Sequence, residues 1–523
     1  QPSAAMWALV GKGSSDPCGD AAKVEPLRIS VVLLSGRFLL QEAEVRPGEK
    51  LREVQSRAEA ALGAPLSGLV SAQGVALDPS ATVRQASLRD REVLSAVAAR
   101  PAQVYSTSMA FAAVVAGGTV VAWGDPGCGG DTGVLSKQLA GGVQHIASTD
   151  FSFAALKKGG SVVSWGHPYA GGDSKLASAE LACGIQHIYS NRRAFAAVNS
   201  AGAVVTWGDT QLGGDSGSAL GCLVDVKHVF SNDGAFAALR NDGSVVAWGD
   251  SRAGGNNNNV ADQLAGGVQH VYSTRKAFAA VKASGAVVTW GDPIAGGDSS
   301  AVADLLVDVT EVFSTHEAFA ALRVGGSLIT WGAPKAGGDS RSVREQLLGG
   351  VTHVFSNASA FAVIKEDLSV VTWGGHYLDL DDAQVHKKLQ EGVCKIFSSR
   401  FAFAALRGDG SVVTWGHSNR GGDSSDVAHE LADGVQHVYA TDNAFAALKG
   451  NGSVVTWGVQ DAGGDSSAVR EQLASGVDCI YSTCNAFAAV KSDGSVVAWG
   501  GQRSGGDCSA VRDQFPIHSA QKK

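Results

Sequence analysis

An acidic side chain follows a Gly-Gly pair at regular intervals along the chain, and carboxylates are the ligands that Ca²⁺ prefers. The members of this set are Asp131, Asp173, Asp215, Asp298, Asp339, Asp423, Asp465 and Asp507. Asn256 replaces the carboxylate in one copy, and Leu380-Asp381 disrupts the motif in another. Calcium needs about six to eight oxygen ligands around one ion, whereas each copy supplies a single carboxylate. We therefore expect each aspartate to cap a short helix after a tight glycine turn.

Six of the 13 histidines lie in one motif, in which an aliphatic residue, any residue and His precede Val or Ile. They are His145, His187, His228, His270, His353 and His437. Glu311, Lys395 and Cys479 stand at this position in other copies. A position that accepts such different chemistry is expected to face solvent rather than to bind a metal. The chain also has no Gly-x-Ser-x-Gly elbow, His-Glu-x-x-His helix or phosphate loop, so we predict no catalytic residue, metal or cofactor.

Two loops vary from copy to copy in ways that suit protein recognition. One follows a short strand, as in Asn191-Arg192-Arg193, and the other follows a Trp-Gly pair, as in His167-Pro168-Tyr169. Arg, Tyr and Phe side chains anchor protein interfaces when a rigid scaffold presents them. The candidate partner-binding residues are Arg192, Arg193, Arg275, Lys276, Arg400, Phe401, Tyr169, Tyr377, His417 and Arg420. Unselected drift of exposed loops would give the same variety and is the alternative.

A long repeat must position these loops. Trp-Gly recurs ten times at spacings of 41 or 42 residues, which leaves only Trp7 of the 11 tryptophans outside the pattern. The repeated region covers residues 101–518. The ten tryptophans are Trp123, Trp165, Trp207, Trp248, Trp290, Trp331, Trp373, Trp415, Trp457 and Trp499. A unit of this size cannot bury its own apolar face, so neighbouring units are expected to stack.

Each unit is predicted to form three short strands and one short helix. In the copy from Val435 to Gly476, VQHVYAT alternates apolar and polar residues, AFAALK follows a polar turn, and SVVTWG follows an Asn-Gly turn. The segment AGGDSS then leads into AVREQLA, where Val469 and Leu473 share one face of a helix. Asp465 or Ser466 is expected to cap that helix.

The predicted fold class of the repeats is mainly β, with ten units of about 42 residues in a β-propeller-like array. The small alanines of AFAA let adjacent sheets approach, and Trp and Phe fill the space between them. An open superhelical β/α solenoid is the alternative, because propellers usually have about four to eight blades. No strand is visibly shared between the first and last units to close a ring.

Residues 26–100 have a different composition and predict a small N-terminal α+β domain. Strands are expected in LRISVVLLSGRFLLQEAEV, a helix in GEKLREVQSRAEAALG, and further strands in GLVSAQGVALD and EVLSAVAA. Residues 1–25 are predicted to be a flexible leader, and residues 519–523 a tail. The domain resembles ubiquitin-like β-grasp domains in element order, in its hairpin turn and in a late run of Leu77, Asp78, Thr82 and Val83.

The ubiquitin-like resemblance implies a built-in module rather than a conjugated one. The last strand passes through Ala98, Ala99 and Arg100 into Pro101, without the Arg-Gly-Gly tail that ubiquitin uses for conjugation. Leu69 and Val70 would then belong either to a binding surface or to ordinary strand core.

The unit AFAALKxDGSVVTWG, followed by a glycine-rich loop, resembles the repeats of the regulator of chromosome condensation family. That resemblance implies a propeller of a kind used for guanine-nucleotide exchange, ubiquitin-ligase targeting and protein inhibition. The chain departs from the family pattern where Ala444-Phe445 replaces the usual His, where Gly463 to Ser466 replaces Gly-Gln-Leu-Gly, and where a helix follows instead of a strand. Exchange activity is therefore not carried over, whereas protein contacts are.

The charge and the cysteine pattern indicate which partners and which cellular compartment to expect. The 42 basic and 50 acidic residues give a net charge of −8, which disfavours nucleic acid as a partner. The eight cysteines follow no repeat position and form no Cys-x-x-Cys pair, so a reducing, intracellular compartment is expected. The uncharged segment from Val104 to Gly124 is interpreted as two strands, so no membrane insertion is expected. The chain begins with Gln1, so a removed targeting peptide would leave no trace.

Three function classes follow from the sequence. The first is a non-catalytic protein-interaction scaffold that carries a ubiquitin-like module. The second is an adaptor or substrate-recognition component in a ubiquitin-ligase or proteasome pathway, which both resemblances suggest. The third, a guanine-nucleotide exchange factor, is least favoured because no catalytic constellation recurs.

Overall fold

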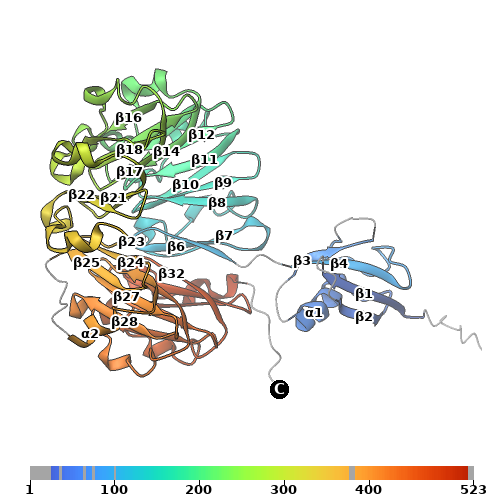
Figure 1. The fold of residues 1–523 in the computed structure, drawn as a ribbon. Helices are drawn as coiled ribbons and strands as arrows, with labels where there is room; N and C mark the ends of the chain where they lie inside the picture. The colour runs from blue at the N-terminus through green and yellow to red at the C-terminus, as the bar shows by residue number, and fades with distance from the viewer. Residues whose placement is uncertain are drawn as a thin grey trace, which may run out of the picture. The chain divides into compact units, whose positions relative to one another are not determined.

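The chain folds into two compact units, Gln1–Ala99 and Arg100–Lys523, which we describe separately. The computed structural model describes residues 25–33, 38–62, 66–72, 77–98, 102–375 and 383–515 (Figure 1). The predicted tail, and all of the predicted leader except Glu25, lie outside these residues.

The N-terminal unit is a four-stranded sheet with one helix. The sheet has the order β2-β1-β4-β3, in which β1 and β4 are parallel and the other pairs are antiparallel. The elements are β1 Leu27–Leu33, β2 Phe38–Val45, α1 Leu51–Leu62, β3 Leu66–Val70 and β4 Glu92–Ala98. This is the element order that the sequence predicts; the finer likeness to ubiquitin stays a prediction.

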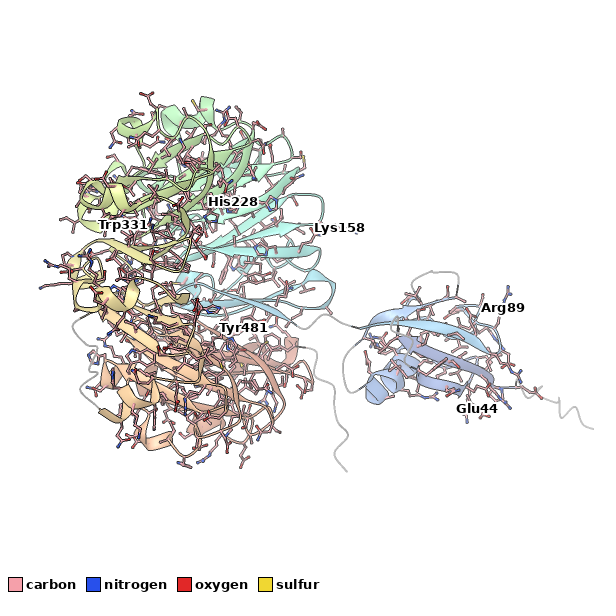
Figure 2. All side chains as sticks on the ribbon, in the orientation of Figure 1. Glu44, Arg89, Lys158, His228, Trp331 and Tyr481 are labelled. Atoms are coloured by element: carbon pink, nitrogen blue, oxygen red, sulfur yellow. The ribbon has the colours of Figure 1, made fainter. Side chains whose placement is uncertain are left out.

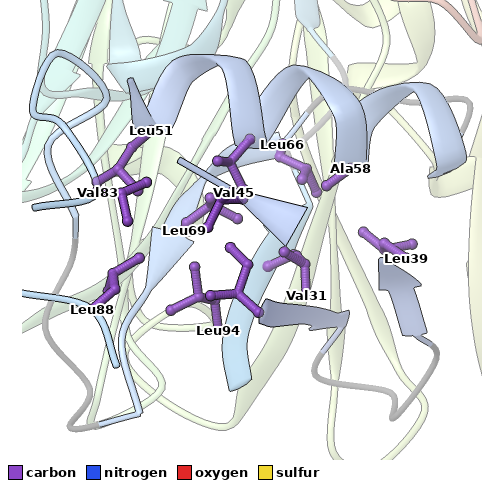
Figure 3. Packing of buried hydrophobic residues seen from close by; sticks show 13 residues of the cluster. Val31, Leu39, Val45, Leu51, Ala58, Leu66, Leu69, Val83, Leu88 and Leu94 are labelled. Carbon is purple, nitrogen blue, oxygen red and sulfur yellow. The ribbon is translucent and has the colours of Figure 1, made fainter. Parts of the chain in front are cut away.

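The core of this unit lies between α1 and the sheet. Leu51, Val54 and Ala58 recur on one face of α1 and pack with Val31 and Leu94 of the central strands (Figure 3). The helix forms because its apolar residues are three or four positions apart.

Leu69 of β3 belongs to the same core and is only 3% exposed. Of the two roles open to Leu69, strand core is therefore the one the structure supports.

The larger unit consists of ten antiparallel three-stranded sheets, one for each repeat, which we call blades. In every blade the second strand lies between the first and the third. Blades one to five comprise β5 Gln103–Ser106, β6 Ala110–Val114, β7 Val120–Gly124, β8 Val143–Ser148, β9 Ser152–Lys157, β10 Val162–Gly166, β11 Ile185–Ser190, β12 Ala194–Asn199, β13 Val204–Gly208, β14 Val226–Ser231, β15 Ala235–Arg240, β16 Val245–Gly249, β17 Val268–Ser273, β18 Ala277–Lys282 and β19 Val287–Gly291. Blades six to ten comprise β20 Val309–Ser314, β21 Ala318–Arg323, β22 Leu328–Gly332, β23 Val351–Ser356, β24 Ala360–Lys365, β25 Val370–Gly374, β26 Val393–Ser398, β27 Ala402–Arg407, β28 Val412–Gly416, β29 Val435–Ala440, β30 Ala444–Lys449, β31 Val454–Gly458, β32 Val477–Ser482, β33 Ala486–Lys491 and β34 Val496–Gly500.

The same aromatic pair fills every interface between blades. In blade nine, Phe445 of β30 lies opposite Trp457 of β31, and the rings stack with centroids 5.2 Å apart. Both rings pack against Ala402 and Ala404 of the preceding blade, all of them buried. Only small side chains at these alanine positions leave room for the rings, because protein interiors are close-packed. The Ala-Phe-Ala-Ala motif is thus a blade-stacking motif.

The ten blades close into a ring. In Figure 1 the colour follows the blades from cyan through green and yellow to red. The indole Nε1 of Trp165 donates to the carbonyl of Gly129 in the preceding blade at 2.9 Å, and the first blade repeats this bond with the last, from Trp123 to Gly505 at 3.1 Å. Val104 and Phe111 share one buried cluster with Ala488 and the residues around it. The propeller-like array is therefore confirmed and the open superhelix is wrong, although the sheets stay separate and form no continuous barrel.

The predicted helix at the end of each unit is largely absent. Short 3₁₀ turns replace it, such as η17 Ser467–Val469, and blade seven alone among the described residues has an α-helical turn there, α2 Ala383–Lys388. Isolated helices of this length are only marginally stable, and 3₁₀ bonds suit such short connections, so most blades form a 3₁₀ turn there. The expected apolar face still points inward, since Leu473 is only 2% exposed.

Candidate interaction face and axial cavity

Both families of variable loops lie at the same end of the ring. The turn after the first strand and the loop after Trp-Gly are at the same end of each blade, because the three strands are antiparallel and the third runs in the direction of the first. We call this end the axial face. The hairpin turn between the second and third strands, where Lys158 lies, is at the opposite end (Figure 2).

A buried polar residue holds the two loops together in nine of the ten blades. Thr441 Oγ1 donates to the carbonyl of Ala462 at 3.0 Å and accepts from the amide of Ala444 at 3.0 Å. Equivalent bonds to the loop carbonyl are made by Thr107, Thr149, Asn191, Asn232, Thr274, Thr315, Ser399 and Thr483. A buried hydroxyl or amide that satisfies several backbone groups rigidifies the loops it joins. The two loops are therefore joined in the same way in these nine blades.

One residue from each blade contributes to a ring around the axis, which we call the inner ring. Its members, in blade order, are Ser108, Asp150, Arg192, Asp233, Arg275, His316, Ala358, Arg400, Asp442 and Cys484. Nine of the ten donate their amide N–H to the carbonyl of the next member at 3.0–3.2 Å, including Cys484 to Ser108. Because hydrogen-bonded neighbouring backbones lie about 4.8 Å apart, ten of them enclose an opening roughly 15 Å across.

The inner ring borders a polar cavity of about 940 Å³ on the ring axis. Hydroxyl and amide side chains from the ends of the first strands complete its wall, among them Ser148, Ser231 and Ser273. Ser231 Oγ donates to the carbonyl of Ser190 at 2.7 Å, and Ser190 Oγ to that of Ser148 at 2.7 Å. The cavity therefore combines a fixed hydroxyl-rich wall with a rim of varied charge.

Three ion pairs lie between neighbouring members of the inner ring. Arg192 Nε lies 2.7 Å from Asp150, Arg275 Nε lies 3.6 Å from Asp233, and Arg400 Nη1 lies 3.5 Å from Asp442. The hydrogen bond to Asp150 raises the pKa of Arg192 above its usual value. These pairs are partly exposed, so each contributes little to stability.

Burial dominates the titration of two other members of the inner ring. It raises the pKa of the Cys484 thiol, with Asp442 adding to the rise, so the thiol is not an activated nucleophile. It also lowers the pKa of His316 to about 4, helped by the charges of Arg275 and Arg400.

The structure brings several predicted site residues together. Arg420 stacks over the ring of Phe401 at 4.5 Å, Arg400 lies 5.4 Å from the same ring, and Arg420 Nη1 donates to Asn443 Oδ1 of the next blade at 2.9 Å. Cation–π contacts of this kind hold a guanidinium flat on an aromatic face. This cluster joins both loop types of blade eight.

The remaining predicted residues are spread over the axial face. Arg193 pairs with Asp209 at 3.4 Å, Tyr169 is 77% exposed, Lys276 is exposed, and His417 is partly buried. Tyr377 lies outside the described residues. Arg192, Arg275 and Arg400 form the ion pairs of the inner ring described above.

Sequence reasoning missed part of the inner ring. Asp233, His316 and Asp442 were not among the candidates, although they occupy the same repeat position as Arg192 and Arg275. Aligning the ten copies column by column would have revealed them, because this column holds acidic and basic residues directly after a position that is always Thr, Asn or Ser.

The six repeat histidines lie on the first strands, the innermost of each blade. Figure 2 shows His228 toward the middle of the ring of blades. Tyr189 Oη lies 3.2 Å from His228 Nδ1, and Phe230 lies 4.8 Å from His270 between ring centroids. The solvent-facing prediction is confirmed for five of the six, whereas His437 is half-buried. Although most of these side chains reach solvent, partial desolvation by neighbouring side chains lowers the pKa of His145, His228, His270 and His437.

The aspartates after Gly-Gly each accept a hydrogen bond at the start of a 3₁₀ turn, in place of the predicted helix cap. Asp465 Oδ1 accepts from the amide of Ser467 at 2.8 Å. The same bond is made by Asp131, Asp173, Asp215, Asn256, Asp298, Asp339, Asp423 and Asp507. Among the described residues no three His, Cys, Asp or Glu side chains gather as a metal site would require.

The seven described cysteines are all free thiols. In the parts of the chain that the structure describes, helices are too short or too polar for a membrane crossing.

No protein-family model matches the chain, and no curated protein matches it. Solved structures with some likeness include yeast RCC1 (Prp20) bound to Kap60, at 14% identity, a TM-score of 0.31, and coverage of 69% of this chain and 79% of that one. Human WBSCR16 matches at 14% identity and a TM-score of 0.27, over 66% and 83% of the two chains. The ectodomain of the Physcomitrella patens receptor kinase CR4 matches at 14% identity and a TM-score of 0.29, over 53% and 73%. At these scores the chains do not superpose as wholes, so the propeller-like fold rests on the sheets and hydrogen bonds described above.

Proposed function

We propose that this protein is a non-catalytic protein-interaction scaffold whose axial face binds partner proteins. The observation that supports this proposal is the contrast between a constant frame and varied side chains. Every blade repeats the Phe–Trp stack, and nine make the same buried loop bond. At the inner ring the same backbone presents Asp, Arg, His, Ala, Ser or Cys.

The residue four positions after each tryptophan varies in the same way on the rim of the axial face. It is Tyr169, Arg252, Ile294, Lys335 or Asp461 in different blades. Tyr169 and Ile294 are 77% and 72% exposed although both are largely apolar. Tyr makes a good interface anchor because it supplies a large contact area at low conformational-entropy cost, and Arg because its guanidinium group donates several hydrogen bonds.

A comparison of two sets of variants tests this proposal. The first combines Tyr169→Ala, Arg193→Ala, Phe401→Ala and Arg420→Ala on the axial face. The matched control combines Lys158→Ala and Glu366→Ala at exposed hairpin tips of the opposite end. Proteins recovered by the full-length chain are quantified with each variant by mass spectrometry.

Partners of the scaffold should be lost with the axial-face variants and kept with the control. Equal recovery with both sets, at unchanged thermal stability, would contradict the axial face as the binding surface. Acceleration of nucleotide release from a small GTPase by catalytic amounts of the chain would contradict the non-catalytic role.

A second candidate function is that of an adaptor in a ubiquitin-ligase or proteasome pathway. The N-terminal sheet order β2-β1-β4-β3, with parallel β1 and β4 and one helix, supports it because ubiquitin-like domains share this arrangement. The test compares the full chain with one lacking residues 1–99. Recovery of ligase or proteasome subunits only when residues 1–99 are present would favour the adaptor role over a general scaffold.

A further inference from the structure

Four consecutive members of the inner ring form a sector that contains two arginines and no acid. These are Arg275, His316, Ala358 and Arg400. Their backbones are joined by three hydrogen bonds, Arg275 to His316, His316 to Ala358 and Ala358 to Arg400, at 3.0–3.2 Å. All four therefore border one stretch of the axial cavity.

The two arginines of this sector are incompletely satisfied. Arg192, elsewhere in the ring, donates to Asp150 at 2.7 Å. In contrast, Arg275 Nε lies 3.6 Å from its carboxylate, beyond hydrogen-bond distance. Arg400 donates through Nη1 to Asp442 at 3.5 Å, a long bond, and its Nε is buried without a hydrogen-bond partner. A buried donor without a partner is costly, so a ligand that accepts from it gains the energy of that bond.

Ala358 leaves space between the side chains of His316 and Arg400, which carry hydrogen-bond donors. Seven of the ten inner-ring positions hold Asp, Arg or His, whose side chains reach into the cavity rim. An alanine at this position opens a notch between His316 and Arg400. Asp233 and Asp442 stand on the outer sides of the two arginines, so they leave the notch itself free of carboxylates.

We propose that this sector binds an oxyanion, a carboxylate or a phosphate group, in the notch at Ala358. The guanidinium groups of Arg275 and Arg400 donate to it, since planar guanidinium groups match such oxygens in charge and geometry. The ring of His316 adds an N–H donor in its neutral form. The anion is either free in solution or carried by an acidic peptide of a partner.

Isothermal titration of the full-length chain tests the proposal with three probes. They are sodium sulfate, inorganic phosphate and a short glutamate peptide, with the glutamine counterpart of the peptide and sodium chloride as blanks at constant ionic strength. Binding of sulfate or phosphate identifies a free anion, whereas binding of the glutamate peptide alone identifies a peptide carboxylate.

Ala358→Asp is the decisive variant. It places a carboxylate in the notch, and the fold accepts it because Asp150, Asp233 and Asp442 occupy the same position in other blades. Ser108→Asp is the matched control, with the same change in charge at the same repeat position, four blades farther around the ring. We expect Ala358→Asp to abolish binding and Ser108→Asp to leave it unchanged.

The double variant Arg275→Gln/Arg400→Gln should weaken binding at least about tenfold, because each charge-assisted hydrogen bond contributes substantially to affinity. Arg192→Gln should have no such effect. Equal loss of binding in Ala358→Asp and Ser108→Asp, or no binding of any probe to the unmodified chain, would overturn the proposal.

Discussion

The indole Nε1 of Trp123 donates to the carbonyl of Gly505 at 3.1 Å, across 382 residues of sequence. The same bond joins eight other pairs of blades that are adjacent in the chain, as between Trp457 and Gly421 at 3.0 Å. The first and last blades thus meet through the same interface as any two neighbours. A ring closed in this way leaves no blade face unpaired.

Removing the closing bond should destabilise the ring as much as removing an internal one. Trp123→Phe and Trp290→Phe each delete one indole donor and leave a buried glycine carbonyl unsatisfied. We expect both to lower the free energy of unfolding by about 1–3 kcal/mol, measured by urea denaturation. No effect of Trp123→Phe beside a clear effect of Trp290→Phe would mean that the ring is open.

The first glycine of each Gly-Gly pair should not tolerate a side chain. Gly171 has φ of +93°, and a Cβ added there would lie 2.5 Å from the ring of Phe195. Gly171→Ala is expected to lower the free energy of unfolding by about 2–4 kcal/mol, because backbone strain and overpacking act together. Urea denaturation measures this loss.

Two other glycines serve as controls for this prediction. Gly117 has φ of +78° with nothing within 4 Å of its added Cβ, so Gly117→Ala measures the backbone cost alone. Gly221 has neither constraint, so Gly221→Ala should be nearly neutral. Equal effects of all three substitutions would exclude the clash with Phe195.

The buried hydroxyl at the end of each first strand should be required for an ordered axial face. Thr441→Val removes the bonds to Ala462 and Ala444 without a large change in volume. We expect this variant to lower the free energy of unfolding by about 1–3 kcal/mol. Thr441→Ser keeps the hydroxyl, as Ser399 does in blade eight, and should retain most of the stability. Hydrogen exchange of the turn amides would show the difference; equal protection in both variants would contradict this role.

The stability of the ring should fall as the pH drops below about 6.5. Burial and two arginines lower the pKa of His316 to about 4, whereas a histidine in the unfolded chain titrates near 6.5. The unfolded state therefore takes up the proton first, so this contribution is complete above about pH 6.5 and is lost as the pH falls toward 4.

His316→Ala should flatten this pH dependence, because alanine stands at the equivalent position of the next blade, as Ala358. The measurement is the urea midpoint of both proteins between about pH 7.5 and about pH 4.5. His145, His228, His270 and His437 have lowered pKa values for the same reason, burial, so part of the slope should remain. Parallel curves for the two proteins would contradict the assignment to His316.

Much of each blade was predictable from local patterns. The two-residue alternation of VQHVYAT, the turn at Asn451-Gly452 and the β-branched SVVTWG predict β29, β30 and β31. The hydrogen bond of Asp465 was predictable for the same reason, since its partner Ser467 is two residues away. The predicted helix is replaced by a 3₁₀ turn at Ser467–Val469, because helices this short are only marginally stable.

The candidate site was predictable only in part. Arg192, Arg400 and Phe401 were recognisable as exposed, varied side chains, but their partners Asp150, Asp442 and Arg420 lie in other turns or loops. The two ion pairs depend on how neighbouring blades stack, and the Phe401–Arg420 contact depends on how two loops of one blade meet, which no local pattern encodes.

The amino-acid sequence by itself determined the number of blades, the three strands of each and the residues that pack them together, because hydrogen bonds between nearby residues and the alternation of side chains decide these features. The tertiary structure alone decided that the array closes, that ten turns meet around one polar cavity, and that Arg275, His316 and Arg400 become neighbours. The reason is that closure is the sum of ten small rotations between blades, and each rotation is set by the packing of Phe, Trp and Ala side chains from two units.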